Sequence, residues 1–220
     1  MRPPFSAEDF FGVFVAYNEA VWPAQVVLAA LGGAAVVLAI VRPDWHGKAI
    51  GYILGGLWMW MGVVYHWVFF LEINPAARLF GALFVLEGAL LAWAGLRVEG
   101  LSFRPAWDTF GWVGGVLIVY ALIAYPLIAI AMGHTYPAQP TFGLPCPTTI
   151  LTLGILLWAR PRIPWPVLVV PILWAIVGAT AVRYFGVVED AMLPIAGILA
   201  GSLILWKNRS ARETRGTARS

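Results

Sequence analysis

One short stretch of the chain, residues 133–150, carries many of the side chains that could do chemistry in an otherwise apolar sequence. It holds Cys146, the only cysteine, and Pro147 after it favours a helix that begins there with Cys146 as its N-cap residue. A thiol at that position meets free backbone N–H groups and the positive end of the helix dipole, which favour the thiolate. Such a thiolate could bind a soft metal ion, accept an acyl group or ligate haem, with Thr148 and Thr149 beside it. The alternative is a small apolar residue packed at a helix end.

Two histidines would extend this thiol into a ligand set for a transition-metal ion. His66 and His134 both fall near the outer ends of predicted helices, so they could approach Cys146. With Glu19 or Asp190 they would make a zinc or copper site. No two of these residues have the spacing of a known metal motif, so the site depends wholly on how the helices pack. For His66, which lies between two aromatic residues, the alternative is an interfacial ring hydrogen-bonded to a neighbour.

Glu87 is a different kind of candidate, because it lies near the middle of a long apolar segment. An ionised carboxylate is costly there, so Glu87 is either protonated, paired across the bundle or facing a watery cavity. The nearest arginine in sequence, Arg78, is more than two helical turns away. Tyr120 or Tyr125 could donate a hydrogen bond to it. The residue indicates either movement of protons or ions, or a structural hydrogen-bond hub.

The composition says what must surround these residues. Of the 220 residues, 61% are hydrophobic and 11% are charged, and the mean hydropathy is +0.82. A soluble domain carries about 25% charged residues, so the sequence predicts a protein embedded in a lipid bilayer. The net charge of +3 lies in short loops and in the C-terminal tail, which is how membrane topology is encoded. This distribution argues against nucleic acid as a partner.

The predicted architecture is an all-α bundle in a single transmembrane domain, residues 1–206. Ser6 followed by Asp9 is typical of a helix start, and residues 6–18 then read as an amphipathic helix at the membrane surface or as an extension of the first span. Seven transmembrane helices follow, each near the roughly 20 apolar residues that a span needs except for the short fifth. They are placed at 21–41, 49–71, 76–96, 109–132, 145–159, 165–185 and 191–206. Residues 207–220 are predicted to be a disordered basic tail.

The basic residues predict an orientation with the N-terminus outside and the C-terminus inside. In that orientation eleven of the fourteen Lys and Arg fall on the inner side, and Arg2, Arg78 and Arg183 remain outside. Three spans end on the inner side in a tryptophan close to a cation, at Trp93, Trp158 and Trp206, as expected of interface anchors.

This orientation gathers the polar side chains on the outer side. Arg183 with Glu189 and Asp190 could form a salt bridge that only ties the last outer loop together. The candidate path for a substrate or ion, with Glu87 at its deeper end, consists of Glu19, His66, Asn74, Glu87, His134, Tyr136, Cys146, Thr148, Thr149, Arg183, Glu189 and Asp190.

Four segments also carry a resemblance to a known family. They are YNEAVWPAQ (17–25), GVVYHWVFFLEINPAARLFGALF (62–84), GHTYPAQPTFGLPCPTTI (133–150) and GVVED (186–190). The chain resembles, over nearly its whole length, an uncharacterised family of small bacterial multi-pass membrane proteins that is a domain of unknown function. The resemblance implies a location in the bacterial inner membrane and carries no established activity.

Three functions remain open on the sequence. Phosphate-binding glycine loops, paired-histidine zinc motifs and serine nucleophile elbows are absent from it. The first function is a small transporter or channel-like protein for a soft metal ion or another small solute. The second is a membrane-embedded enzyme with Cys146 as nucleophile and His66 or His134 as base. The third is an accessory subunit that binds lipid or haem. The protein could also form a homo-oligomer, although nothing in the sequence selects one.

Overall fold

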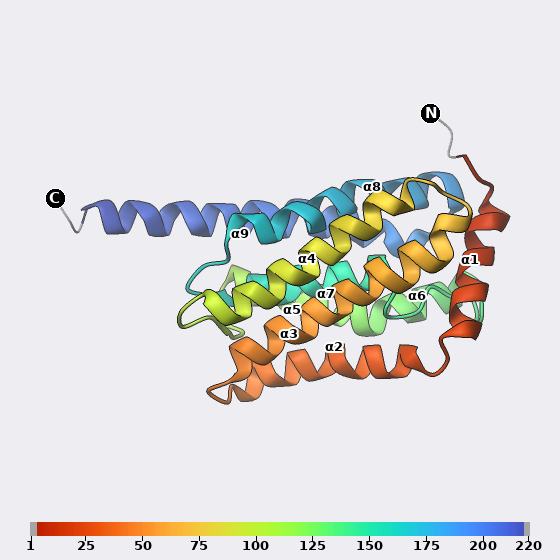
Figure 1. Cartoon of the computed structure of the whole chain (residues 1–220). Helices are drawn as coiled ribbons and strands as arrows, with labels where there is room; N and C mark the ends of the chain where they lie inside the picture. The colour runs from red at the N-terminus through yellow and green to blue at the C-terminus, as the bar shows by residue number, and fades with distance from the viewer. Residues whose placement is uncertain (1–3, 218–220) are drawn as a thin grey trace.

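The computed structural model describes residues 4–217, with side chains as far as Asn208, and shows an all-helical bundle (Figure 1). Several helices continue through short π or 3-10 segments without leaving the helical path. The elements are α1 (Ala7–Ala20), α2 (Ala24–Val41), α3 (His46–Trp60) with η1 (Met61–Phe69) and η2 (Phe70–Glu72), α4 (Ala77–Arg97), β1 (Ser102–Phe103), α5 (Thr109–Val119) with η3 (Tyr120–Ala124) and α6 (Tyr125–Ala131), α7 (Pro145–Leu157), β2 (Ala159–Arg160), η4 (Trp165–Leu168) with α8 (Val169–Phe185), and η5 (Val188–Ala191) with α9 (Met192–Thr217).

Within the described residues, six helices are long and apolar enough to cross a membrane. They are Ala24–Val41, His46–Glu72, Ala77–Arg97, Thr109–Ala131, Trp165–Phe185 and Val188–Asn208. Their apolar side chains face outward as well as inward, as expected when the surrounding solvent is lipid. Each coincides within a few residues with a segment that hydropathy predicts.

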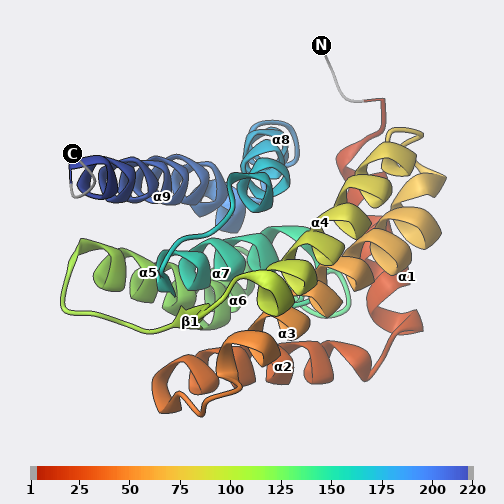
Figure 2. The same cartoon turned by 60° about the vertical axis from the view of Figure 1, so that its left-hand side comes forward.

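The fifth predicted segment, α7, is shorter than these six helices and lies in the interior of the bundle. It has 13 residues, of which all but Cys146 are buried. Helices α2, α3, α5, α8 and α9 all contact it, and it runs between them in Figure 2. Because protein rather than lipid surrounds α7, its length is not fixed by the thickness of the bilayer.

Glycines let neighbouring helices approach closely. Along α3 and η1, Gly51 faces the backbone of Gly95, Gly55 faces the carbonyl oxygen of Gly88, and Gly62 faces the carbonyl oxygen of Gly81. A Cβ atom at Gly55 would lie 2.7 Å from that oxygen, closer than real Cβ atoms approach. Small residues at regular intervals are a common way for helices to pack in lipid.

Helix α1 runs crosswise over one end of the bundle, while the long helices run along it (Figure 1). Ser6 and Asp9 form the reciprocal cap that the sequence predicts at its start. Phe10, Val13, Phe14, Tyr17 and Asn18 are buried, so one face of α1 packs on the bundle.

The opposite end is fastened by polar contacts. His46 Nδ1 lies 2.7 Å from the Pro43 carbonyl oxygen, and the Phe103 N–H donates to His46 Nε2 at 3.2 Å. β1 pairs with β2 in an antiparallel ladder of two residue pairs. Lys207 donates to the Ala159 carbonyl oxygen at 2.6 Å, beside the C-terminal end of α7, where a cation is favoured.

The last helix runs past residue 207, and the disorder predicted for the tail that begins there stays a prediction. α9 continues to Thr217, and residues 218–220 lie outside the described part of the chain. The sequence has no proline between Pro194 and Gly216, so no strong helix breaker ends the helix at the last apolar residue.

Candidate functional site

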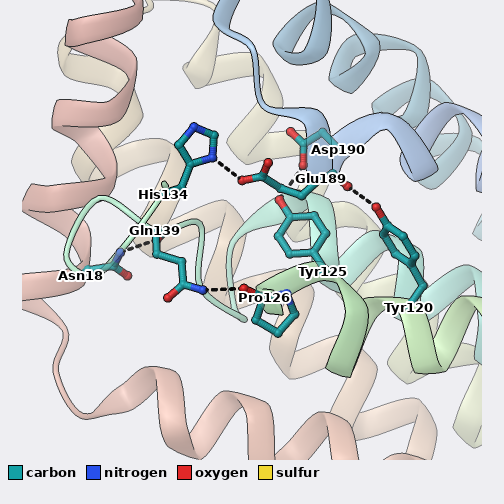
Figure 3. Close-up of polar contacts among 8 residues, drawn as sticks. All are labelled: Asn18, Tyr120, Tyr125, Pro126, His134, Gln139, Glu189 and Asp190. Atoms are coloured by element: carbon teal, nitrogen blue, oxygen red, sulfur yellow. Dashed lines mark hydrogen bonds and ion pairs between the residues drawn. The ribbon is translucent and has the colours of Figure 1, made fainter. Parts of the chain in front are cut away.

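The loop after α6 is held against α1 by one buried asparagine. The side-chain amide of Asn18 donates to the carbonyl oxygens of Pro137 and Gln139, both at 2.7 Å. Its Oδ1 accepts a hydrogen bond from the Thr141 hydroxyl at 2.6 Å. Gln25 donates in turn to the Asn18 backbone carbonyl at 2.7 Å. Figure 3 shows this side chain reaching the loop, which fixes residues 137–141 over the end of the bundle.

The same loop is also tied to α6, to α1 and to the turn between α1 and α2. Gln139 donates through Nε2 to the Pro126 carbonyl oxygen at 3.1 Å, as drawn in Figure 3. Tyr136, one of the predicted site residues, donates to the Asn18 carbonyl oxygen at 3.2 Å and packs edge-on against Trp22. The role that the structure gives Tyr136 is therefore to position the loop.

Glu189 and Asp190 form a second polar group, in η5 between α8 and α9. His134 Nδ1 lies 2.8 Å from the Glu189 carboxylate, and the Tyr120 hydroxyl donates to the Glu189 carbonyl oxygen at 2.8 Å. Tyr125 donates to Asp190 Oδ1 at 2.5 Å. Figure 3 shows both acids turned toward these partners. Both acids are nearly fully buried, so this group joins the loop, α6 and η5 inside the protein.

These contacts correct the salt bridge that the sequence suggested for Arg183. Its side chain is exposed, and no ion pair joins it to Glu189 or Asp190 within the described structure. Arg183 lies in the last turn of α8, whereas the two acids face inward after the chain has turned at Gly186. His134 and the two tyrosines take the places that the arginine was expected to fill.

A cavity of about 290 Å³ opens at this end of the bundle, between α1, η1, α8 and the start of α7. Nearly half of its lining residues are aromatic, and Asp190, Cys146 and Tyr125 form a small polar region. The lining consists of Pro4, Phe5, Phe10, Phe14, Tyr65, Phe70, Asn74, Phe80, Tyr125, Pro140, Leu144, Pro145, Cys146, Trp174, Val177, Gly178, Thr180, Ala181, Tyr184, Phe185 and Asp190.

Cys146 lies in this cavity, but not as a helix N-cap. α7 begins at Pro145 with Leu144 as its N-cap, which puts Cys146 in the first turn. Pro145 fits the first helical position as well as Pro147 does, so the helix begins one proline earlier than predicted. The thiol lies beside the Asp190 carboxylate, and no histidine is among the described residues that line the cavity.

His66 is found deep in the bundle, in a cage of aromatic rings. Its ring centroid lies 4.6 Å from that of Phe84 and 5.2 Å from that of Trp174. Neither ring nitrogen has a hydrogen-bond partner in the described structure. The alternative of an interfacial ring with a polar neighbour is therefore wrong, because this face of η1 packs against α4 and α8 instead of pointing to a loop.

The three predicted metal ligands do not assemble. His134 is engaged with Glu189, His66 is enclosed by aromatic rings, and Cys146 faces Asp190. Across the described residues, no group of three His, Cys, Asp or Glu side chains lies close enough to hold a metal ion.

Glu87 is fully buried in α4, as its place in the sequence predicts. Neither carboxylate oxygen has a partner among the described residues, and the same holds for the hydroxyls of Thr148 and Thr149 in α7. The tyrosines proposed as its donors, Tyr120 and Tyr125, bond to η5 instead. Glu87 does not line the cavity.

Two further predicted residues, Glu19 and Asn74, lie at the α1 end of the bundle. Glu19 is exposed, and Asn74 lies at the cavity, where its Oδ1 accepts from the Ala76 N–H at 3.1 Å at the start of α4. Sequence reasoning missed Asn18 and Gln25, which hold the loop, and the phenylalanines of α1 and α8 that wall the cavity. The run of phenylalanines at residues 5–14 was a usable signal for an aromatic wall.

Comparisons with known proteins give one match. A family model that carries the description of a family of unknown function covers residues 7–215, which includes every element from α1 to most of α9. No curated protein and no solved structure matches the sequence.

Proposed function

The chain belongs to that family of unknown function, DUF6064, and we infer a function from the geometry of its own residues. The apolar helical bundle is that of a membrane protein. The cavity at the α1 end is the feature best suited to a specific activity, since ligand pockets are typically concave, mostly apolar and equipped with a few polar groups.

We propose that the protein is a membrane-embedded binding protein that holds a small, largely apolar solute in this cavity. The observation that carries the proposal is the composition of the lining: ten of its twenty-one residues are aromatic, and Asp190 is the charged residue among them. An apolar pocket with few polar groups favours binding of a ligand over its chemical conversion. Cysteine-based catalysis is less supported, because a base beside Cys146 is needed and the neighbouring group is a carboxylate hydrogen-bonded to Tyr125.

The proposed setting is a bacterial inner membrane, with seven crossings and the α1 end outside. With α7 counted, consecutive helices alternate between the two ends of the bundle. The end away from α1 carries Arg42, Lys48, Arg97, Arg104, Arg160, Arg162 and Lys207. An excess of basic residues in short loops is typical of the cytoplasmic side.

Protection of Cys146 from N-ethylmaleimide tests the proposal. The purified protein in a maltoside detergent is labelled with and without naphthalene, a small neutral probe. If the cavity binds apolar molecules, naphthalene slows labelling of Cys146. Val177→Phe, which fills the cavity from α8, abolishes that protection.

The matched control is Ile176→Phe, because Ile176 is the neighbouring residue on α8 and is 65% exposed on the outer surface of the helix. It should leave both labelling and protection unchanged. If Cys146 of the natural chain is labelled as fast with naphthalene as without it, and the same holds for Val177→Phe, the cavity is ruled out as a binding site.

A second function, transport of protons or ions, is favoured by the polar atoms inside the bundle that have no partner. Glu87, His66, Thr148 and Thr149 are all fully buried, and their polar side-chain atoms lack hydrogen bonds in the described structure. Buried polar groups of this kind are normally satisfied by water or a ligand. Proton flux into liposomes that contain the protein should then fall in Glu87→Gln and persist in Glu99→Gln, whose residue is exposed. If proton flux into liposomes without the protein equals the flux into liposomes that contain it, this function is ruled out.

A further inference from the structure

The cavity contains one buried carboxylate and no basic side chain to balance it. Asp190 is 2% exposed, and among the described residues that line the cavity there is no Lys, Arg or His. Tyr125 donates to its Oδ1 at 2.5 Å, and Cys146 lies beside it. Both neighbours are neutral hydrogen-bond donors, so neither supplies a positive charge.

The basic residues nearest in sequence or space are directed elsewhere. His134 pairs with the neighbouring acid, Glu189, at 2.8 Å. Arg183 is exposed and makes no ion pair with either acid in the described structure. A buried carboxylate is costly unless it is paired, and here the cavity is the open side from which a cation could reach it.

The walls of the cavity suit a cation that cannot donate many hydrogen bonds. Ten of the twenty-one lining residues are aromatic, among them Tyr65, Phe70 and Trp174, and Phe10 and Phe14 of α1. The negative faces of aromatic rings attract quaternary and other alkylated ammonium groups, and cages of such rings recognise them in proteins. Ligands with many hydroxyl or amide groups would leave those groups without partners against these rings.

We propose that the occupant of this cavity is a small lipophilic organic cation, an amine or quaternary ammonium with an apolar body, whose charge is balanced by Asp190. This inference rests on the proposed binding function and names its ligand class. At about 290 Å³, the cavity lies at the small end of known ligand pockets, which suits a body the size of one aromatic ring. The ligand would enter past α1, whose Phe10 and Phe14 form part of the aromatic wall.

Two ligands of the same shape separate charge from apolar fit. Benzyltrimethylammonium carries a quaternary nitrogen where neopentylbenzene carries a carbon atom, so that the two differ in charge alone. Their binding to the full-length protein is measured by titration calorimetry in a maltoside detergent, whose uncharged headgroup does not attract cations. The cation should bind at least about tenfold more tightly than the neutral compound.

Asp190→Asn should remove that advantage: it should weaken binding of the cation at least about tenfold and leave binding of the neutral compound unchanged. Glu72→Gln is the matched control, because Glu72 is an exposed acid at the same end of the bundle and is not part of the lining. It should bind the cation as the natural chain does. If Asp190→Asn does not fold, the comparison of the two ligands on the natural chain still shows whether the cavity prefers a cation.

The outcomes separate this inference from the function on which it rests. Equal binding of the two ligands by the natural chain would overturn the choice of a cation and leave a neutral apolar site. If neither ligand binds and naphthalene fails to protect Cys146, both proposals are wrong. If a short-chain phosphatidylcholine competes and the matching phosphatidylglycerol does not, the source of the cation is a lipid headgroup. If neither lipid competes, the source is a free amine.

Discussion

The start of α1 depends on two residues that cap each other. The Ser6 N–H donates to Asp9 Oδ2 at 2.9 Å, and the Asp9 N–H donates to Ser6 Oγ at 3.1 Å. Hydrogen bonds from the Ser6 hydroxyl, and then from its backbone N–H, lower the pKa of Asp9 below its usual value of 3.8. A lowered pKa means that the carboxylate supports the helix above that value, and that this support is lost as the pH falls through the lower folded-state pKa.

We therefore expect Asp9→Asn to speed hydrogen exchange of the first α1 amides at neutral pH. The ratio of exchange rates between the variant and the natural chain should fall toward one as the pH drops through the lowered pKa of Asp9, because residue 9 is then neutral in both proteins. Because the ratio is taken at each pH, the intrinsic pH dependence of exchange cancels. A ratio that is already one at neutral pH would show that the charge of Asp9 does not hold the helix start.

At this same scale, the sequence predicts local pairs and misses distant ones. Ser6 and Asp9 are three residues apart, so a single turn of helix brings them together whatever the rest of the chain does. His134 and Glu189 are 55 residues apart, and Asn18 and Gln139 are 121 apart. Polar residues at one end of the bundle could be recognised from topology, but their partners depend on helix packing, which a single sequence does not specify.

Among the elements, the close packing of α3 on α4 offers the sharpest test. Gly55 faces the carbonyl oxygen of Gly88, while Gly56, the next residue on the helix, has nothing within 4 Å of an added Cβ. Gly55→Ala should destabilise the protein by about 1–3 kcal/mol, because the helices must move apart to accept the methyl group. Gly56→Ala should be neutral or stabilising by about 0.5–1 kcal/mol, because alanine favours the helix.

Unfolding of both variants in mixed detergent micelles, followed by circular dichroism, gives the comparison. Equal stability of the two variants would mean that the α3–α4 contact is looser than the structure indicates. The positions of these helices are predictable because apolar length and charged ends mark them. Their facing glycines are not, since glycines occur on both sides of α3 and only the packing shows which of them meet α4.

At the scale of the whole molecule, the structure gives the two ends of the bundle different characters. The α1 end holds the cavity, the polar loop and the buried acids, and of the described Lys and Arg side chains it carries Arg78 and Arg183. The other end holds the two short strands and Lys207, with most of the remaining cations. Hydropathy alone predicts the bundle, whereas the crosswise course of α1 over one end follows from which of its residues are buried.

Charge asymmetry of this kind predicts that the cavity opens on the outer side of the membrane. In a Cys146→Ala background, Glu72→Cys marks the α1 end and Glu99→Cys marks the other end, and both replaced residues are exposed. A membrane-impermeant maleimide should label Glu72→Cys in intact bacterial spheroplasts and Glu99→Cys only after lysis. The reverse pattern would show that the protein is inserted in the opposite orientation, with the cavity toward the cytoplasm. Labelling of both cysteines before lysis, in spheroplasts that exclude the reagent from a cytoplasmic control protein, would mean that the chain inserts in both orientations.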